Sequence, residues 1–163
     1  MLTAWKLQIS LLGIFIAALM MEVSIIPSLW APLRVDFLIG MIIGQIVFIP
    51  FSQGFPFVIL ASLLIEAFSG ARVGLLPLLY IAVFLATDFL KEVIYLENVF
   101  IQGFLGVFFY VVIAGATAMI TGATFLEDMI IPLIAGMAMT GALSPVMAAL
   151  VGRLQASYGI REP

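Results

Sequence analysis

Long apolar runs separated by short polar breaks make up most of the chain. The runs cover residues 7–30, 37–51, 57–68, 73–90, about 99–121 and 129–151. Each run is continuous, whereas the strands of a membrane barrel alternate between apolar and polar residues over about ten positions. Only helices and closed barrels satisfy the backbone within lipid, so the pattern predicts an all-α integral membrane protein with about six transmembrane helices.

The second and third runs are short against the ~20 residues that a straight span needs. We expect these two helices to be tilted or shielded from lipid by their neighbours, and a re-entrant hairpin is the main alternative. Helix-breaking residues at positions 52–56 predict a turn between the second and third helices. The first run lacks a good small-residue cleavage site after a compact apolar core, so we interpret it as a retained helix that ends near Pro27.

Composition agrees with the membrane interpretation. The chain is 65% hydrophobic and 9% charged, with a mean hydropathy of +1.33, and a soluble domain is nearer half apolar and a quarter charged. We find no polar linker, so residues 1–163 are interpreted as a single domain. The chain has no Cys and no His, which removes thiolate chemistry and the commonest metal ligand and general base.

Charges are few, but they favour one orientation. With an even number of spans, Lys6, Lys91, Arg153 and Arg161 share a side with both termini. The positive-inside rule then predicts that both termini are cytoplasmic. The net charge of −3 is small and scattered, and no basic cluster indicates nucleic-acid binding.

Three ionisable residues mark the first two helices. Glu22 lies near the outer end of the first run and either reaches the headgroups, pairs with Arg34, or faces a pocket or partner inside the bundle. Arg34 and Asp36 precede the second helix. They are two residues apart and would not face each other on a helix, so a loop pair near the headgroups is the favoured interpretation.

Glu66 and Arg72 lie six residues apart around a predicted turn at Ser69 and Gly70. On one straight helix they would occupy different faces, but a chain reversal could bring them together. A structural clamp on the turn is favoured over a ligand site.

Gly40 and Gly44 form a GxxxG pattern, which lets helix backbones approach closely. The pattern alone does not distinguish packing within the bundle from contact with a partner. We predict that a single-span partner associates through small-residue faces, with Gly40 and Gly44 as the leading candidates. Elsewhere, Asn98 is a candidate cap for the fifth helix, and Thr124 and Glu127 match a capping box before the sixth.

The acidic residues form no spacing suited to Mg²⁺ or Ca²⁺, and no nucleophile or phosphate-loop motif is found. We therefore expect no catalytic, metal or cofactor site, and the sequence favours a binding or scaffolding protein over an enzyme.

Three places in the chain resemble the MreD family, the small membrane proteins of the bacterial rod-shape system. The first is Leu19-Met20-Met21-Glu22, followed by Pro27 and Pro32. The second is the segment 32–36 that enters the next helix. The third is Leu63-Leu64-Ile65-Glu66-Ala67-Phe68-Ser69-Gly70, followed by Gly74-Leu75.

The resemblance implies a non-enzymatic component of the elongation machinery in the bacterial inner membrane. It implies MreC as the partner, with links to the MreB filament and to the peptidoglycan polymerase RodA with its penicillin-binding transpeptidase. It also implies a bundle similar to the substrate-binding subunits of energy-coupling-factor vitamin transporters. Such a subunit, which holds a vitamin in an outward-facing pocket, is the alternative function.

Overall fold

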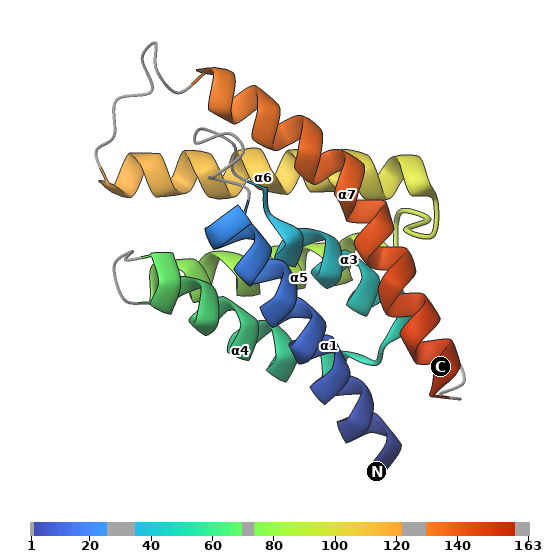
Figure 1. The fold of residues 1–163 in the computed structure, drawn as a ribbon. Coiled ribbons are helices and arrows are strands. Elements are labelled where there is room, and N and C mark those ends of the chain that lie inside the picture. Colours follow the sequence, from blue (N-terminus) through green and yellow to red (C-terminus); the bar gives the residue numbers. More distant parts are fainter. Residues whose placement is uncertain (1, 26–34, 70–73, 122–129, 159–163) are drawn as a thin grey trace.

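The computed structural model describes residues 2–25, 35–69, 74–121 and 130–158. All of the regular elements in these ranges are helical, which confirms the predicted all-α fold (Figure 1). They are α1 (Leu2–Met20), which continues into the π-helical turn η1 (Met21–Ile25), followed by α3 (Phe37–Phe48), α4 (Phe51–Ser69), α5 (Leu75–Lys91), α6 (Val99–Thr121) and α7 (Ile130–Ser157).

Four of these helices are long and apolar enough to cross a membrane: α1 with η1, α4, α6 and α7. The helix α3 has 12 residues, so at 1.5 Å per residue it is only about 18 Å long. The apolar core of a bilayer is about 30 Å thick. The described chain thus has the expected six α-helices, but only four of them are long and apolar enough to span a membrane, so the six predicted spans are confirmed in part.

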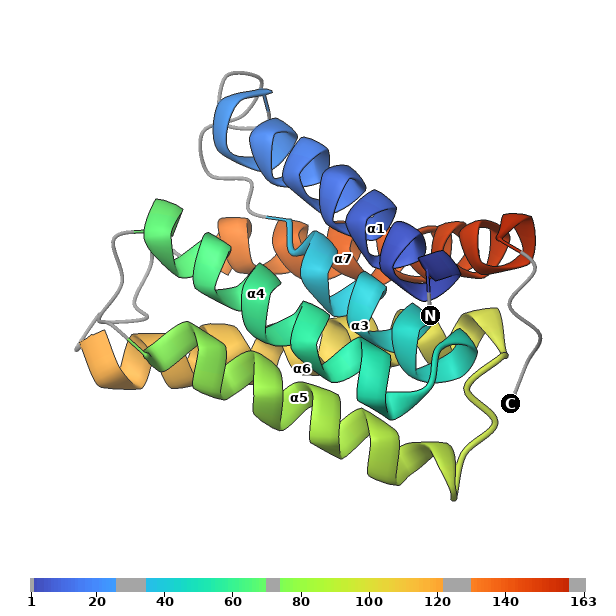
Figure 2. The ribbon, with the colours of Figure 1, turned by 90° about the horizontal axis from the view of Figure 1, so that it is seen from below.

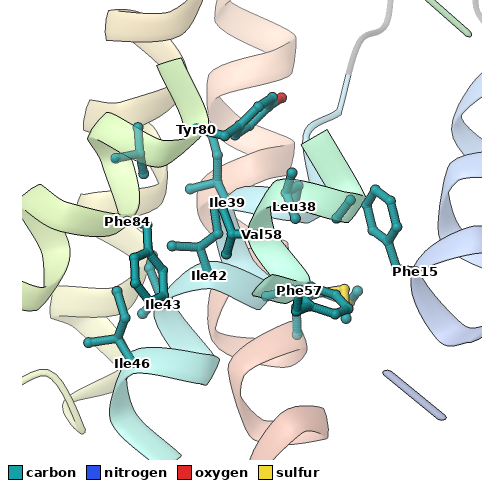
Figure 3. Close-up of a cluster of buried hydrophobic side chains, with 14 of the residues drawn as sticks. Phe15, Leu38, Ile39, Ile42, Ile43, Ile46, Phe57, Val58, Tyr80 and Phe84 are labelled. Carbon is teal, nitrogen blue, oxygen red and sulfur yellow. The ribbon is translucent and has the colours of Figure 1, made fainter. Parts of the chain in front are cut away.

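The short helix α3 lies at the centre of the bundle. Every residue from Leu38 to Ile46 is buried, and Figure 3 shows α3 side chains among those of Phe15, Phe57 and Phe84 from three other helices. A helix that is apolar all round is either buried in protein or faces lipid, and the burial of α3 shows the first case. This confirms that neighbouring helices shield the second run. The 19 residues of α4 can span the bilayer, which argues against a hairpin of two short segments.

The turn between α3 and α4 is earlier than predicted. It lies at Ile49 and Pro50, and α4 has already begun at Phe51. The Pro50 carbonyl accepts hydrogen bonds from the N–H groups of Gln53 and Gly54, at 2.9 and 3.1 Å. The first turn is thus wound before Pro56, whose fixed φ is compatible with a helix. The turn predicted at residues 52–56 is wrong because its breakers lie within the helix.

The start of α1 and the end of α7 lie at the same end of the bundle (Figures 1 and 2). We call this the terminal end; it includes Leu2, the α3–α4 and α5–α6 connections, and Ser157. The far end includes η1, the start of α3, the end of α4 and the starts of α5 and α7. At the terminal end, Asn98 Oδ1 accepts from the Phe100 N–H at 2.9 Å, which confirms the predicted cap.

Candidate functional site

Asp36 caps α3 at the far end. Its backbone is extended, and its Oδ1 accepts a hydrogen bond from the Ile39 N–H at 3.2 Å. Asp is among the preferred residues at this position because its short side chain satisfies a free N–H of the first turn. Asp36 therefore fixes where α3 starts. Arg34 lies outside the described residues, so its predicted loop pair with Asp36 stays a prediction.

The same residue connects α3 to two other helices. The Tyr80 hydroxyl on α5 donates a short hydrogen bond to Asp36 Oδ2, and the Asp36 N–H donates to Thr140 Oγ1 on α7 at 3.1 Å. Tyr80 is 3% exposed and Thr140 is fully buried. Buried polar groups in lipid require partners, and here each of the three satisfies another.

Glu22 faces the same region from η1. It is half-buried, and it interacts electrostatically with Tyr80, as does Tyr110 of α6. A π-helical turn in place of a regular α-helical one is frequent at functional sites. We refer to Glu22, Asp36, Tyr80, Tyr110 and Thr140 as the far-end cluster.

Glu66 holds the connection between α4 and α5. Both of its carboxylate oxygens accept from the Gly74 N–H, at 2.8 Å each. Gly74 has φ +88°, in the left-handed region that favours glycine, and Glu66 is 9% exposed. The carboxylate thus clamps the start of α5. Gly70 and Arg72 lie outside the described residues, so the Glu66–Arg72 contact stays a prediction.

Gly40 and Gly44 pack within the bundle. A Cβ on Gly40 would lie 2.8 Å from Ser144 Cα, and one on Gly44 would lie 2.7 Å from Ala148 Cα. Both distances are too short for a side chain, so the two glycines allow α3 and α7 to touch along their backbones. This face is occupied by the chain's own helix, and the structure supports the intramolecular alternative rather than contact with a partner.

Acids lie at both ends of the bundle, whereas the described bases all lie at the terminal end, beside Asp88, Glu92 and Glu97. Glu22, Asp36 and Glu66 lie toward the far end, whereas the described basic residues are Lys6, Lys91 and Arg153, all toward the terminal end.

Among the described residues, no three His, Cys, Asp or Glu side chains could hold a metal ion together. Both oxygens of Asp36 and of Glu66 accept from protein donors, which suits them to positioning helices.

Tyr80 and Thr140 were not identified from the sequence. Each is a single polar residue within an apolar helix, and their distances from Asp36 along the chain are 44 and 104 residues. Helical periodicity reports only neighbours three or four residues apart, so no local signal connects them. A polar side chain in the middle of an apolar run is the only indication that a partner is needed.

A depression of about 390 Å³ lies at the terminal end. It is lined by Val47 at the end of α3 and by residues 91–97 between α5 and α6. Within this connection the Tyr95 hydroxyl donates to Glu97 Oε2 at 2.5 Å. The depression is separate from the far-end cluster, because the two occupy opposite ends of the bundle.

Comparison with known proteins supplies no family assignment: no protein family, curated protein or solved structure matches the chain.

Proposed function

We propose that this chain is a non-enzymatic, multi-pass component of the bacterial rod-shape elongation complex, similar to MreD, with an MreC-like protein as its partner. Through that partner it would be linked to RodA and its penicillin-binding transpeptidase. The proposal rests on the sequence resemblance and on the way the fold arranges the residues that carry it.

The observation that supports the proposal most is that the described acids of the three resembling segments lie toward one end of the bundle. Each contributes an acid, Glu22, Asp36 or Glu66, and all three acids lie toward the far end. Asp36 and Glu66 each hold a helix start in position. All three acids thus lie on the side of the bundle where a shared docking or assembly role would use them.

The distribution of bases supports an orientation in the inner membrane. Lys6, Lys91 and Arg153 lie toward the terminal end, and the positive-inside rule places that end in the cytoplasm. The far-end cluster would then face the periplasm.

The partner surface must lie outside the α3–α7 contact, because Gly40 and Gly44 are covered by α7. The outer faces of α1 and α6 present large exposed apolar side chains, among them Ile9 and Phe104. A single-span partner in the membrane would pack against one of these faces through van der Waals contact.

The alternative, a vitamin-binding transporter subunit, requires an outward-facing pocket. The depression of about 390 Å³ lies at the terminal end, which is the cytoplasmic end in the orientation above. This observation favours the scaffold over the transporter.

The test is affinity purification of the tagged chain from its own host, together with depletion of the chain during growth. We expect an MreC-like protein to co-purify, its gene to neighbour this one, and depleted cells to become round. Co-purification of a transporter ATPase module with normal cell shape would overturn the proposal and favour the vitamin transporter.

A further inference from the structure

Among the described residues, the buried side-chain nitrogen and oxygen atoms that have no hydrogen-bond partner all belong to glutamines. They are Nε2 and Oε1 of Gln8, Nε2 and Oε1 of Gln45, Oε1 of Gln53 and Nε2 of Gln155. Gln45 is fully buried and Gln155 is 3% exposed. All four residues lie within a few positions of a helix boundary at the terminal end. Burying an amide group away from water without a hydrogen-bond partner costs free energy. These four glutamines at the terminal end therefore call for an explanation.

Two of the four amides lie at the first turn of α4: Gln53 belongs to this turn and Gln45 faces it. The Gln45 amide oxygen lies 3.0 Å from where a Cβ on Gly54 would be, so the fully buried side chain points at this turn. Gln53 lies one turn before Phe57, whose ring meets that of Phe15 on α1 with centroids 6.1 Å apart.

A third amide, that of Gln8, lies toward the same end on the neighbouring helix α1. Both α1 and α4 begin at the terminal end and run toward the far end. Gln8 lies two turns before Phe15 in α1, and the Phe15–Phe57 contact defines the seam between the two helices. Gln8 and Gln53 therefore both lie on the terminal side of this seam.

The first turn of α4 is itself a source of hydrogen-bond donors. Its third and fourth N–H groups, those of Gln53 and Gly54, donate to the Pro50 carbonyl. The first two, those of Phe51 and Ser52, have no acceptor within the helix, and both residues are exposed. The turn contains no acidic residue, so the positive end of the helix dipole is not offset locally.

Free N–H groups at a helix start, together with amide donors, suit an anionic oxygen, and phosphate is the common case. The start of a spanning helix lies at the level of the lipid headgroups, where phosphodiesters are the most abundant anions. We propose that the start of α4, with Gln8, Gln45 and Gln53, binds the phosphate of a phospholipid headgroup in the leaflet at the terminal end.

In this site the Phe51 and Ser52 N–H groups hold the phosphate oxygens from outside. The amides of Gln53 and Gln8 line the seam behind it, and Gln45 closes the inner wall against Gly54. The glutamines also offer carbonyl oxygens, which can accept from hydroxyl or ammonium groups of the headgroup. The acyl chains lie along the α1–α4 surface.

The test uses two substitutions that add a negative charge at the terminal end. Gln53→Glu places a carboxylate at the third position of α4, where it stabilises the helix dipole but repels phosphate. Ser157→Glu places the same charge on an exposed residue at the end of α7 and is the control. Native mass spectrometry of each full-length protein in mild detergent counts the phospholipids retained.

We expect Gln53→Glu to reduce retained phospholipid about tenfold, which corresponds to the loss of one charge-assisted hydrogen bond, and Ser157→Glu to retain it. Equal retention by Gln53→Glu and the wild type would overturn the proposal. Gln45→Met, which keeps the side-chain volume, should also lower the amount of retained phospholipid, whereas Gln155→Met should not. Loss of phospholipid from Gln155→Met but not from Gln45→Met would count against the site.

A second measurement separates the lipid from free phosphate. The backbone amide resonances of Phe51 and Ser52 are followed by NMR in delipidated protein while dihexanoyl phosphatidylglycerol or inorganic phosphate is added. We expect saturable shifts with the short-chain lipid and at least about tenfold weaker binding of inorganic phosphate. Equal affinity for the two would overturn the lipid assignment, and no shift with either would overturn the site.

Discussion

The carboxylate of Glu66 accepts from the Gly74 N–H through both oxygens, at 2.8 Å each, across a connection that joins two antiparallel helices. A charged acceptor makes this hydrogen bond stronger than a neutral one, and burial of Glu66 protects it from competition by water. The contact explains why a carboxylate stands near the end of an apolar helix.

Glu66→Gln should therefore destabilise the protein by about 1.5–3 kcal/mol, because one amide oxygen replaces two charged ones. Thermal unfolding in a defined detergent measures the loss. Gly74→Ala should cost a further ~1–2 kcal/mol through its left-handed backbone. An unchanged unfolding temperature in Glu66→Gln would show that the clamp adds nothing to stability.

Arg72 can be tested against the same carboxylate. If Arg72 pairs with Glu66, the double substitution to Gln should be no worse than the worse single one. A coupling of ~0.6 to ~2 kcal/mol is typical of polar contacts in membrane proteins. Purely additive losses in the double-mutant cycle would rule out the pair and leave Gly74 as the partner of Glu66.

Asp36 and Tyr80 should be energetically coupled. Tyr80→Phe removes the hydroxyl that donates to Asp36, and we expect it to destabilise the protein by about 1–3 kcal/mol, because a buried carboxylate oxygen loses its donor. In an Asp36→Ala background the same change should cost less. Equal costs in the two backgrounds, measured by equilibrium unfolding, would contradict the coupling.

Gly44 and Gly13 form a matched pair for testing helix packing. Gly44→Ala inserts a Cβ 2.7 Å from Ala148 Cα and should cost about 1–3 kcal/mol by overpacking. Gly13 has no atom within 4 Å of its potential Cβ, so Gly13→Ala should stabilise the protein by about 0.5–1 kcal/mol. Co-purification with the partner separates the two roles: a partner contact at Gly44 would lower co-purification without loss of folded protein.

Tyr95 offers a prediction on pH. Its hydrogen bond to Glu97 and the nearby negative charge raise the pKa of Tyr95 above its ordinary value. The neutral phenol is the form that is favoured in the folded protein, so the contribution of this contact is present below the ordinary pKa and is lost as the pH rises through the raised one.

Glu97→Gln should lower the pKa of Tyr95 toward its ordinary value. The measurement is the difference in phenolate absorbance between each protein and its Tyr95→Phe counterpart, followed through an alkaline titration. Identical midpoints in the wild type and Glu97→Gln would contradict the contact.

The predicted orientation can be tested with reporters that are active only in the periplasm. Fused after Pro163 the reporter should be inactive, and inserted within residues 124–128 it should be active, because the basic residues favour a cytoplasmic terminal end. The opposite pattern would invert the topology and place the far-end cluster in the cytoplasm.

Local patterns predicted the helices well and the contacts between them poorly. Continuous apolar runs identified each helix, and the polar Asn98 identified a helix start. Both signals come from residues that are close together in the sequence. The position of Pro56 misled the prediction of a turn, since the Pro50 carbonyl had already organised the preceding residues. Pro56 lies inside α4, where it removes one i→i−4 hydrogen bond without ending the helix.

The far-end cluster shows the limit more sharply. Asp36 was interpreted as part of a loop pair with Arg34, whereas its partner Tyr80 lies on another helix and has no sequence relation to it. The Gly40–Gly44 spacing predicted that another helix packs closely against α3, but it did not indicate which helix. Both relationships depend on tertiary packing, which a single sequence does not display.

The burial of α3 also affects how the chain is made. This helix is too short to span the bilayer, and its glycine face is complete only when it meets Ser144 and Ala148 of α7, which are synthesised about a hundred residues later. During translation α3 must therefore be held in a provisional position, by the insertion machinery or at the membrane surface. A chain truncated before Ile130 would keep this face open, and membrane proteases and insertion chaperones could recognise it as the mark of an unfinished protein.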